Sequence, residues 1–203
     1  MSEPTPLVHV VDDDVSFLTA VSRLLRASGH AVRTFTKAED FLAQLGDTPG
    51  CVIADLRMPG LDGLDLQAAL AQHANSLPVI FLTGHGDIPT TVRAMRQGAE
   101  DFLTKGASKE ELLEAVRHAL GRDAVQRAER NRLRELRARF DALTPRERDV
   151  LRQVVRGRLN KQIAADLNIT ERTVKLHRTA ITSKLEVRSV AELTQLVQAA
   201  GAL

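Results

Sequence analysis

Six side chains in the first half of the chain have the chemistry for phosphoryl transfer, and they follow apolar runs of strand length. They are Asp12, Asp13, Asp14, Asp55, Thr83 and Lys105. Carboxylates that lie close together repel one another unless a cation intervenes, and an incomplete set of oxygen ligands suits Mg²⁺. A hydroxyl and an ammonium at the same edge suit an incoming phosphoryl group. The sequence therefore predicts a magnesium-dependent phosphoryl-transfer site, provided that the fold brings these strand ends together.

Asp55 is the best candidate for the nucleophile, because it stands alone at the end of its apolar run and is followed by LRMPG. A carboxylate can attack a phosphoryl donor in line while a metal ion and a lysine neutralise charge on the transferring oxygens. A single Asp at a strand end is more often a cap or turn residue. Carboxylates, a threonine and a lysine at four strand ends are much harder to obtain by chance.

The elements that must position these residues alternate regularly. Apolar runs lie at 7–11, 31–35, 51–54, 78–82 and 101–104, with helix-period segments near 15–28, 37–45, 62–73 and 88–97 and a fifth from Ser108. Five alternating units predict an α/β fold, a five-stranded doubly wound parallel sheet of the flavodoxin-like type with helices on both faces. Ligands of such sheets bind at the carboxyl ends of the strands, near the point where the strand order reverses. The acidic cluster is expected at that edge.

The two halves of the chain differ in charge. Residues 1–121 hold 10 Lys and Arg against 16 Asp and Glu, a balance of −6, whereas residues 122–203 hold 18 against 10, a balance of +8. Phosphate backbones attract Lys and Arg through counterion release, so the second half is the one expected to meet a polyanion. A solvated basic face is the alternative. A chain of 203 residues is long enough for two small domains.

Composition also limits location and redox chemistry. The N-terminus is short and polar, and no apolar run approaches the roughly 18 residues that span a bilayer, which predicts a cytoplasmic protein with no membrane partner. The chain has one cysteine, Cys51, within an apolar run. It cannot form an intramolecular disulfide and is expected to be a buried thiol.

A long helix is predicted from Ser108 to about Phe140. Ser108 with Glu111 three residues later forms a candidate capping box. Apolar residues recur on one face at Leu112, Val116, Leu120 and Ala124. Gly121 is a possible interruption, but the apolar spacing resumes at Leu133. This Arg- and Glu-rich stretch is expected to be a signalling helix or a short dimer coil, and a solvated linker helix is the alternative.

The last part of the chain is predicted to be all-α, with four short helices near 145–156, 160–166, 171–185 and 189–200. The middle two, joined by NIT, have the pattern helix, turn, helix, with Thr170 capping the second. Their buried seam is expected to be Ile163, Ala164, Leu167, Val174, Ile181 and Leu185. The seam leaves a basic face with Lys175, Arg178 and Lys184 beside Thr173, His177 and Thr179. That composition is expected of a helix that enters a DNA major groove, and a solvated helical hairpin is the alternative.

The segments VVDDD, DLRMPGLDG, FLTGHGD and DFLTKG resemble, in order and spacing, the motifs of two-component receiver domains, most closely the FixJ-like branch. The resemblance covers nearly all of residues 7–120 and implies that Asp55 is the phosphoacceptor. It further implies Mg²⁺ ligation by Asp13, Asp55 and the backbone carbonyl of Arg57 with Asp12 assisting, phosphate contacts by Thr83 and Lys105, and a conformational switch formed by Thr83 and Phe102.

One position departs from the receiver pattern. The family usually has a proline in a cis bond directly after the lysine, whereas this chain has Gly106 followed by Ala107. A non-proline cis bond costs roughly 3 kcal/mol, so the Lys105–Gly106 bond is expected to be trans and the loop to differ, which leaves the placement of Lys105 open. Phosphorylation chemistry is expected to survive, with an altered transfer rate or switch.

The segments LTPRERDVL, NKQIA, TERTVKLHR and KL resemble the LuxR-type helix-turn-helix over residues 143–200. This resemblance implies that the positions nearest the base edges of DNA are Lys175, Leu176 and Thr179. It implies mostly phosphate contacts for Asn160, Lys161, Thr173, His177 and Arg178.

Together the two resemblances imply a two-component response regulator with a receiver at 1–121, a helical linker at 122–142 and a DNA-binding domain at 143–203. The implied partners are a sensor histidine kinase, promoter DNA, RNA polymerase and, after phosphorylation, a second copy of the chain. It is expected not to be an enzyme beyond receiver-intrinsic phosphotransfer and autodephosphorylation.

Two alternatives remain open at the level of sequence. A constitutive DNA-binding protein with a docking receiver is favoured if Gly106 disables the switch. A phosphatase with a nucleophilic Asp is disfavoured, because Arg57 stands where its second catalytic acid would be.

Overall fold

The structure is a computed structural model that describes residues 5–73, 76–84 and 88–200. The chain divides into two compact units, residues 1–127 and 128–203. The first unit contains the strands β1 (Leu7–Val11), β2 (Ala31–Phe35), β3 (Gly50–Ala54), β4 (Val79–Thr83) and β5 (Asp101–Thr104). Its helices are α1 (Val15–Ala27), α2 (Ala38–Ala43), α3 (Gly63–Gln72), α4 (Ile88–Arg96) and the first part of α5 (Lys109–Asp141).

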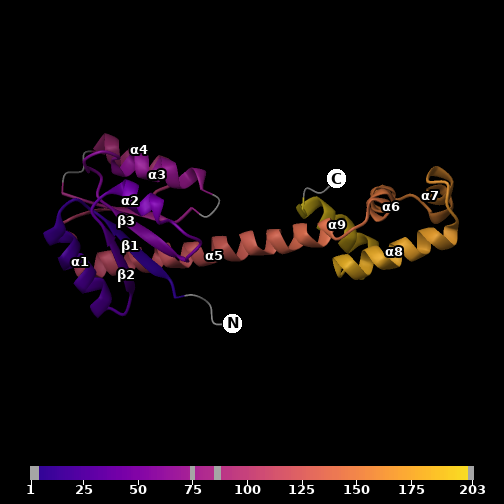
Figure 1. The fold of residues 1–203 in the computed structure, drawn as a ribbon, viewed down its shortest axis with the longest axis horizontal. Coiled ribbons are helices and arrows are strands. Elements are labelled where there is room, and N and C mark those ends of the chain that lie inside the picture. The colour runs from indigo at the N-terminus through magenta and orange to yellow at the C-terminus, as the bar shows by residue number, and fades with distance from the viewer. Residues whose placement is uncertain (1–4, 74–75, 85–87, 201–203) are drawn as a thin grey trace. The chain divides into compact units, whose positions relative to one another are not determined.

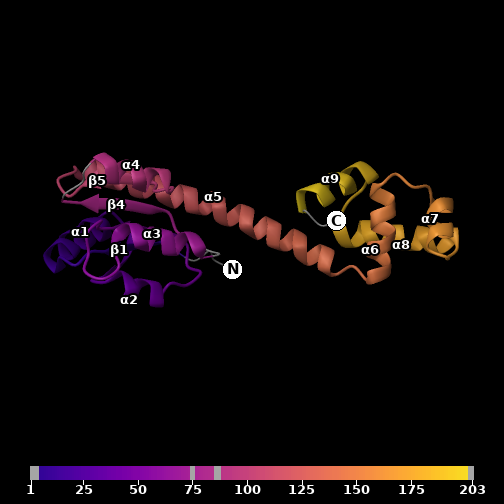
Figure 2. The same cartoon turned by 90° about the horizontal axis from the view of Figure 1, so that it is seen from above.

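The five strands of the first unit form one parallel sheet with the order β2-β1-β3-β4-β5. Figure 1 labels β1, β2 and β3 of this sheet. Helices cover both faces of this sheet (Figure 2). One face packs a core against α1 and α5, with Val10, Leu25 and Val116 almost fully buried. The other packs against α2, α3 and α4, around Phe41 and Phe81. The predicted α/β doubly wound fold is therefore confirmed.

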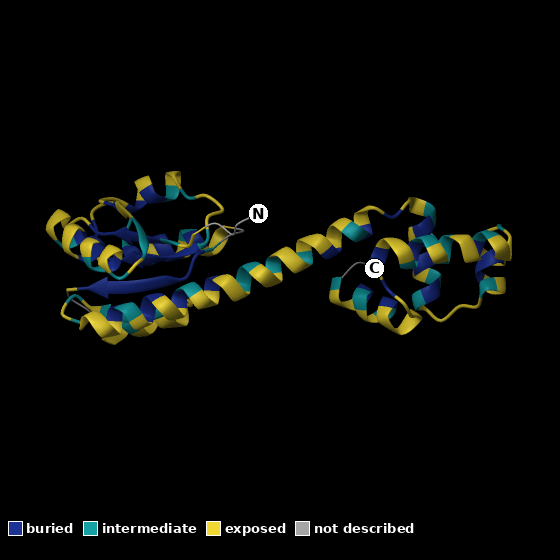
Figure 3. Ribbon diagram, turned by 90° about the horizontal axis from the view of Figure 1, so that it is seen from below, coloured by how far each residue is buried: buried dark blue, intermediate teal, exposed yellow. Residues whose placement is uncertain are grey.

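Burial along the strands follows from the helices that cover both faces of the parallel sheet. Every residue of β3 and β4 is buried, as expected for inner strands, whereas the edge strand β2 is largely half-buried or exposed. Figure 3 shows buried residues in the sheet and exposed residues on the outer sides of the helices. Cys51 lies in β3 with no exposed surface, which confirms the predicted buried thiol. Burial raises the pKa of this thiol to about 12.

Helix α5 begins with the predicted capping box. The Ser108 N–H donates to the Glu111 carboxylate at 2.7 Å, and the Glu111 N–H donates to the Ser108 hydroxyl at 3.2 Å. The helix continues through Gly121 without a break. Ala124, which by spacing shares one face with Leu112, Val116 and Leu120, is exposed. The neighbouring polar residue, Asp123, takes the buried position instead, with 1% of its surface exposed.

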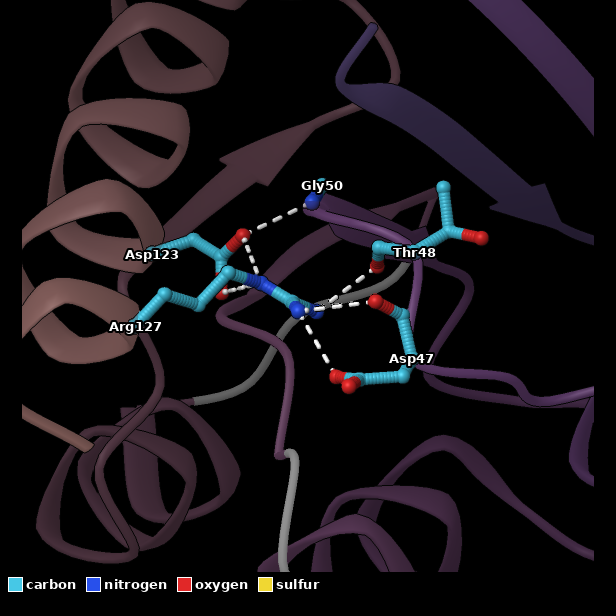
Figure 4. A network of polar contacts seen from close by, with 5 residues as sticks. All are labelled: Asp47, Thr48, Gly50, Asp123 and Arg127. Atoms are coloured by element: carbon cyan, nitrogen blue, oxygen red, sulfur yellow. Dashed lines mark hydrogen bonds and ion pairs between the residues drawn. The ribbon is translucent and has the colours of Figure 1, made fainter. Parts of the chain in front are cut away.

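Asp123 and Arg127 attach α5 to the loop before β3, and we call this contact the α5 clamp (Figure 4). Asp123 accepts a hydrogen bond from the Gly50 N–H at 2.8 Å and is paired with the Arg127 guanidinium at 2.9 Å. The same guanidinium donates to the carbonyl oxygens of Asp47 and Thr48 at 2.9 and 2.7 Å, and to the Asp47 carboxylate at 2.8 Å. Because each buried oxygen of Asp123 has a partner, the polar pair is tolerated inside the unit.

The second unit contains the end of α5 with α6 (Pro145–Val155), α7 (Asn160–Asp166), α8 (Glu171–Leu185) and α9 (Val190–Ala200). Thr144 and Glu147 form a capping box at the start of α6, and the Thr170 hydroxyl accepts a hydrogen bond from the Thr173 N–H at the start of α8. The predicted seam forms part of the core, which also takes in Leu136 and Phe140 from α5. The predicted all-α architecture is therefore confirmed. Among the described residues, no helix combines the length and apolarity that a membrane crossing needs.

Candidate functional site

The strand order places the predicted acidic residues at one point of the sheet edge. Val11 of β1 pairs with Ala54 of β3, so the next residues, Asp12 and Asp55, leave adjacent strands side by side. The Asp55 N–H donates to the Val11 carbonyl oxygen at 2.9 Å and continues the strand pairing. The strand order also reverses between β1 and β3, which is where ligands bind in open α/β sheets.

Three of the four predicted carboxylates converge at this edge. Asp12, Asp13 and Asp55 each offer an oxygen within 4.8 Å of the others, and Asp12 and Asp55 are buried while Asp13 is exposed. Such a set of hard oxygen donors with one side open to solvent fits Mg²⁺. Asp14 does not join them, because its carboxylate caps α1 by accepting hydrogen bonds from the Ser16 and Phe17 N–H groups.

Lys105 reaches the carboxylates despite the glycine that follows it. Its ammonium lies 2.7 Å from an Asp12 oxygen and 2.9 Å from an Asp55 oxygen. Burial alone would lower the pKa of Lys105, but hydrogen bonds and charges from the two carboxylates raise it above its usual value, so the side chain is charged. The described residues contain no cis peptide bond, so the expected trans Lys105–Gly106 bond is confirmed.

The two oxygens of Asp55 have different surroundings. One accepts a hydrogen bond from the Leu56 N–H at 2.6 Å and lies 3.4 Å from the Arg57 nitrogen. The other faces Lys105. Burial raises the pKa of the neighbouring Asp12, and the charge of Asp55 acts in the same direction, while Lys105 and the Asp14 N–H oppose it. The site thus holds excess negative charge that one lysine does not fully balance.

The other predicted residues of this edge lie nearby in the fold. Thr83 ends β4 with 1% of its surface exposed, and its carbonyl oxygen accepts a hydrogen bond from the Lys105 N–H at 2.8 Å. Phe102 in β5 is half-buried with its ring 6.0 Å from that of Phe81. Arg57 is exposed two residues after Asp55. Residues 85–87 of the FLTGHGD motif lie outside the described residues.

Two residues that the sequence did not single out also shape this site. Gly63 has no space for a side chain, since a Cβ there would lie 2.4 Å from the Asp55 carbonyl oxygen. In the sequence, Gly63 is the last residue of the motif DLRMPGLDG, which could have indicated its importance. Phe17 places its ring centroid 4.4 Å from the Lys105 ammonium. Phe17 lies in the helix-period segment near 15–28, and nothing in the sequence indicated this contact.

The predicted DNA-binding residues lie on α7 and α8 of the second unit. Lys161, Lys175, Leu176 and Thr179 are exposed, and Leu176 has 64% of its surface exposed although it is apolar. Asn160, Thr173, His177 and Arg178 are half-buried. The Arg178 guanidinium donates to the Asn160 side-chain oxygen at 3.1 Å, so α8 is joined to the start of α7. An exposed leucine among polar residues suits contact with a partner surface.

Lys184, a residue of the predicted basic face, forms an ion pair within the second unit. The Lys184 ammonium lies 2.7 Å from the Glu147 carboxylate and donates to the Ala142 carbonyl oxygen at 3.2 Å. Lys184 is exposed, as expected for the basic face, but its ammonium forms these contacts within the second unit. A buried carboxylate at the start of α6 needs a counter-charge, and Lys184 at the end of α8 supplies it.

Comparison with known proteins defines the class. The response regulator receiver domain family matches residues 8–117, and the family of bacterial regulatory proteins of the luxR type matches residues 141–197. The chain belongs to the response regulators that join a receiver domain to a LuxR-type DNA-binding domain. These matches confirm the predicted family.

Individual relatives match over nearly the whole length. The chain is 42% identical to response regulator protein TmoT of Ectopseudomonas mendocina, over 98% of this chain and 90% of that protein. It is 41% identical to transcriptional regulatory protein FixJ of Azorhizobium caulinodans, over 99% of this chain and 95% of that one. The solved structure of response regulator StyR has a TM-score of 0.86 and 45% identity, covering 96% of this chain and 98% of that chain.

Proposed function

We propose that Asp55 accepts a phosphoryl group from a sensor histidine kinase and that phosphorylation controls binding of the second unit to promoter DNA. The observation that supports this most directly is the pairing of Lys105 with both Asp12 and Asp55 at 2.7 and 2.9 Å. It gathers a carboxylate nucleophile, a second carboxylate and a cation at the edge of the sheet where ligands bind. Relatives named as transcriptional regulators favour the same output.

Each residue has a distinct part in the proposed transfer. An Asp55 oxygen attacks the phosphorus atom while the bond from phosphorus to the histidine nitrogen of the kinase breaks and the histidine leaves, and the Leu56 N–H holds the other carboxylate oxygen in place. Lys105 neutralises charge on the transferring oxygens, and the Thr83 hydroxyl at the end of β4 contacts the phosphoryl group once it is attached.

The metal site belongs to the same proposal. Asp13, Asp55 and the backbone carbonyl of Arg57 would hold Mg²⁺, with Asp12 assisting. The ion would supply positive charge against the phosphoryl oxygens. Asp12 already has an environment that disfavours its own negative charge, so a cation near it relieves repulsion from Asp55.

The proposed control of DNA binding depends on a difference in stability between two conformations of the receiver. Phosphorylation shifts an equilibrium only by its preference for one conformation, so the phosphorylated form must favour a dimer through movement of Thr83 and Phe102. A receiver dimer would bring two copies of α8 to DNA half-sites about one helical turn apart. There Lys175, Leu176 and Thr179 would read bases, and RNA polymerase would be the next partner. The proposed division of tasks is a receiver at 1–121, a helical linker at 122–142 and a DNA-binding domain at 143–203, with the first residues of the linker, through Arg127, packing in the compact unit of the receiver.

The experiment that tests the proposal measures intact mass after incubation with acetyl phosphate and Mg²⁺. Wild type and Asp55→Asn are compared, with size-exclusion elution and binding to a promoter fragment recorded on the same samples. We expect wild type alone to gain one phosphoryl mass, shift toward a dimer and bind DNA more tightly. If neither protein gains mass, or both gain it equally, Asp55 is not the acceptor. If DNA binding is unchanged by phosphorylation, the receiver is a docking module.

A further inference from the structure

We propose that Phe17 is a positioning residue for phosphoryl transfer, which holds the Lys105 ammonium in line with Asp55 through the face of its ring. This inference rests on the proposed function of Asp55. It adds a residue from α1 to a site otherwise built from the ends of strands.

The start of α1 fixes Phe17 close to the acidic cluster. The Asp14 carboxylate caps the helix and accepts a hydrogen bond from the Phe17 N–H at 3.0 Å. The Phe17 side chain packs on the core between α1 and α5. The segment that continues from Asp12 and Asp13 into α1 therefore also positions the Phe17 ring. The centroid of this ring lies 4.4 Å from the Lys105 ammonium nitrogen.

The ring holds the ammonium without taking a hydrogen bond from it. A lysine ammonium has three N–H donors, and Asp12 and Asp55 account for two of them. An aromatic face attracts a cation through its quadrupole and offers no lone pair. A third carboxylate in this place would neutralise the ammonium, whereas the ring leaves its charge and its third donor available for a phosphoryl oxygen.

The loop that carries Lys105 has little other support for the side chain. A Cβ added at Gly106 would find its nearest atom, the Thr104 hydroxyl oxygen, 3.9 Å away, so nothing packs closely at that position. The Ala107 N–H donates to the Thr104 carbonyl oxygen at 2.9 Å and closes a turn around Lys105 and Gly106. A cavity of about 270 Å³, lined in part by Phe17, Lys105 and Ala107, gives the lysine room to move. On the side of this cavity, the contact with the Phe17 ring of α1 is therefore what limits movement of the Lys105 ammonium.

The kinetic test compares substitutions at Phe17 by the rate at which wild-type and variant protein gain one phosphoryl mass from acetyl phosphate and Mg²⁺. We expect Phe17→Leu to lower the rate roughly three- to tenfold, as expected for loss of a partly desolvated cation–π contact. Phe17→Tyr, which keeps the ring, should retain the wild-type rate. Leu24→Met is the matched control, because Leu24 lines the same cavity on the same helix. A Phe17→Leu rate equal to that of wild type overturns the proposal.

A double-mutant cycle separates positioning from a purely structural effect. In a Lys105→Ala background, Phe17→Leu should cause no further loss of rate, because the group that it positions is gone. A further loss as large as in wild type would show that Phe17 acts on the fold instead, and would overturn the inference.

A spectroscopic readout needs neither donor nor metal. The ring current of Phe17 should shift the Lys105 side-chain protons upfield in a proton–carbon correlation spectrum of protein labelled with carbon-13 lysine, and Phe17→Leu should remove this shift while Phe17→Tyr retains it. An unshifted Lys105 in wild type contradicts the ring contact. Failure of Asp55→Asn to block phosphorylation would instead contradict the proposed function, so the two failures can be told apart.

Discussion

Lys184 at the end of α8 forms an ion pair with Glu147 at the start of α6, with 2.7 Å between the ammonium and the carboxylate. The side chain of Glu147 has 7% of its surface exposed and that of Lys184 has 36%. The Thr144 N–H donates to the same Glu147 carboxylate at 2.7 Å. The orientation of the helix that carries the proposed base-reading residues therefore depends on a charge near the first turn of a different helix.

Removal of this lysine should destabilise the second unit. Lys184→Met leaves the Glu147 carboxylate buried without its counter-charge, and we expect a loss of about 2 kcal/mol in the free energy of unfolding. Hydrogen–deuterium exchange in urea would report the loss within residues 145–200. The double variant Glu147→Gln with Lys184→Met should lose less than the sum of the two single variants. Additive losses would mean that the pair does not couple the two helices.

Lys175, on the exposed side of the same helix, should show the opposite behaviour. We expect Lys175→Ala to weaken specific DNA binding by about 1 to 3 kcal/mol and relax sequence preference, with stability nearly unchanged. Fluorescence anisotropy with specific and scrambled duplexes at several salt concentrations measures both effects. Lys161→Ala, a proposed phosphate contact, is the control and should weaken both duplexes alike. If Lys175→Ala also weakens both equally, Lys175 contacts phosphate and not a base.

The α5 clamp should contribute to receiver stability. Arg127→Met leaves the buried Asp123 carboxylate with the Gly50 N–H but without its cation, and we expect a loss of about 3 kcal/mol. Faster amide exchange of the segment around Gly50 would be the local sign. Arg132→Met on the same helix is the control. Its partner Glu129 is 3.8 Å away and both side chains are exposed, so its effect should stay within about 0.5 kcal/mol. Equal effects of the two variants would rule out the clamp.

The receiver should lose stability in mild acid because of His9. Burial between Phe35 and Phe41, with the charge of Arg33 adding to it, lowers the pKa of His9 to about 4 from 6.5. Between these two pH values the unfolded chain binds more protons than the folded chain, so stability is complete above pH 6.5 and falls as the pH is lowered toward 4.

Thermal unfolding of wild type and His9→Leu across that pH range measures this effect. The difference between the two proteins should change with pH, whereas the exposed His73→Gln should follow wild type throughout. A pH dependence that His9→Leu leaves intact would assign the acid sensitivity to other groups.

The sequence predicted the architecture closely because both halves have strong local signals. The strand at 7–11 and the helix at 171–185 were predicted with the bounds that the structure gives. The approach of Asp12 to Asp55 also followed from sequence, because the carboxyl ends of parallel strands share one edge. Capping at Ser108 and Thr170 was readable since those contacts span three residues.

Contacts between distant polar residues could not be predicted in the same way. The Arg127 side chain bonds to residues 79 and 80 positions earlier, and Lys184 bonds to a residue 37 positions earlier. On an Arg- and Glu-rich helix, such side chains cannot be told from solvated ones by their spacing in the sequence. The apolar spacing along α5 picked out Ala124, whereas the buried residue at this point is its neighbour Asp123. The Phe17 contact could not be predicted for a related reason, because it joins residues 88 positions apart in the chain.

The α5 clamp has a consequence for how such proteins recombine. A receiver and an output domain can be joined in a chimera, and Gly121, shortly after the receiver family match ends at residue 117, is an obvious place to join them. A graft made there would discard Asp123 and Arg127 and leave the buried Gly50 N–H without its acceptor. A chimera that keeps residues 1–127 retains residues 122–127 of α5. This segment has the sequence of a linker, but it packs as part of the receiver.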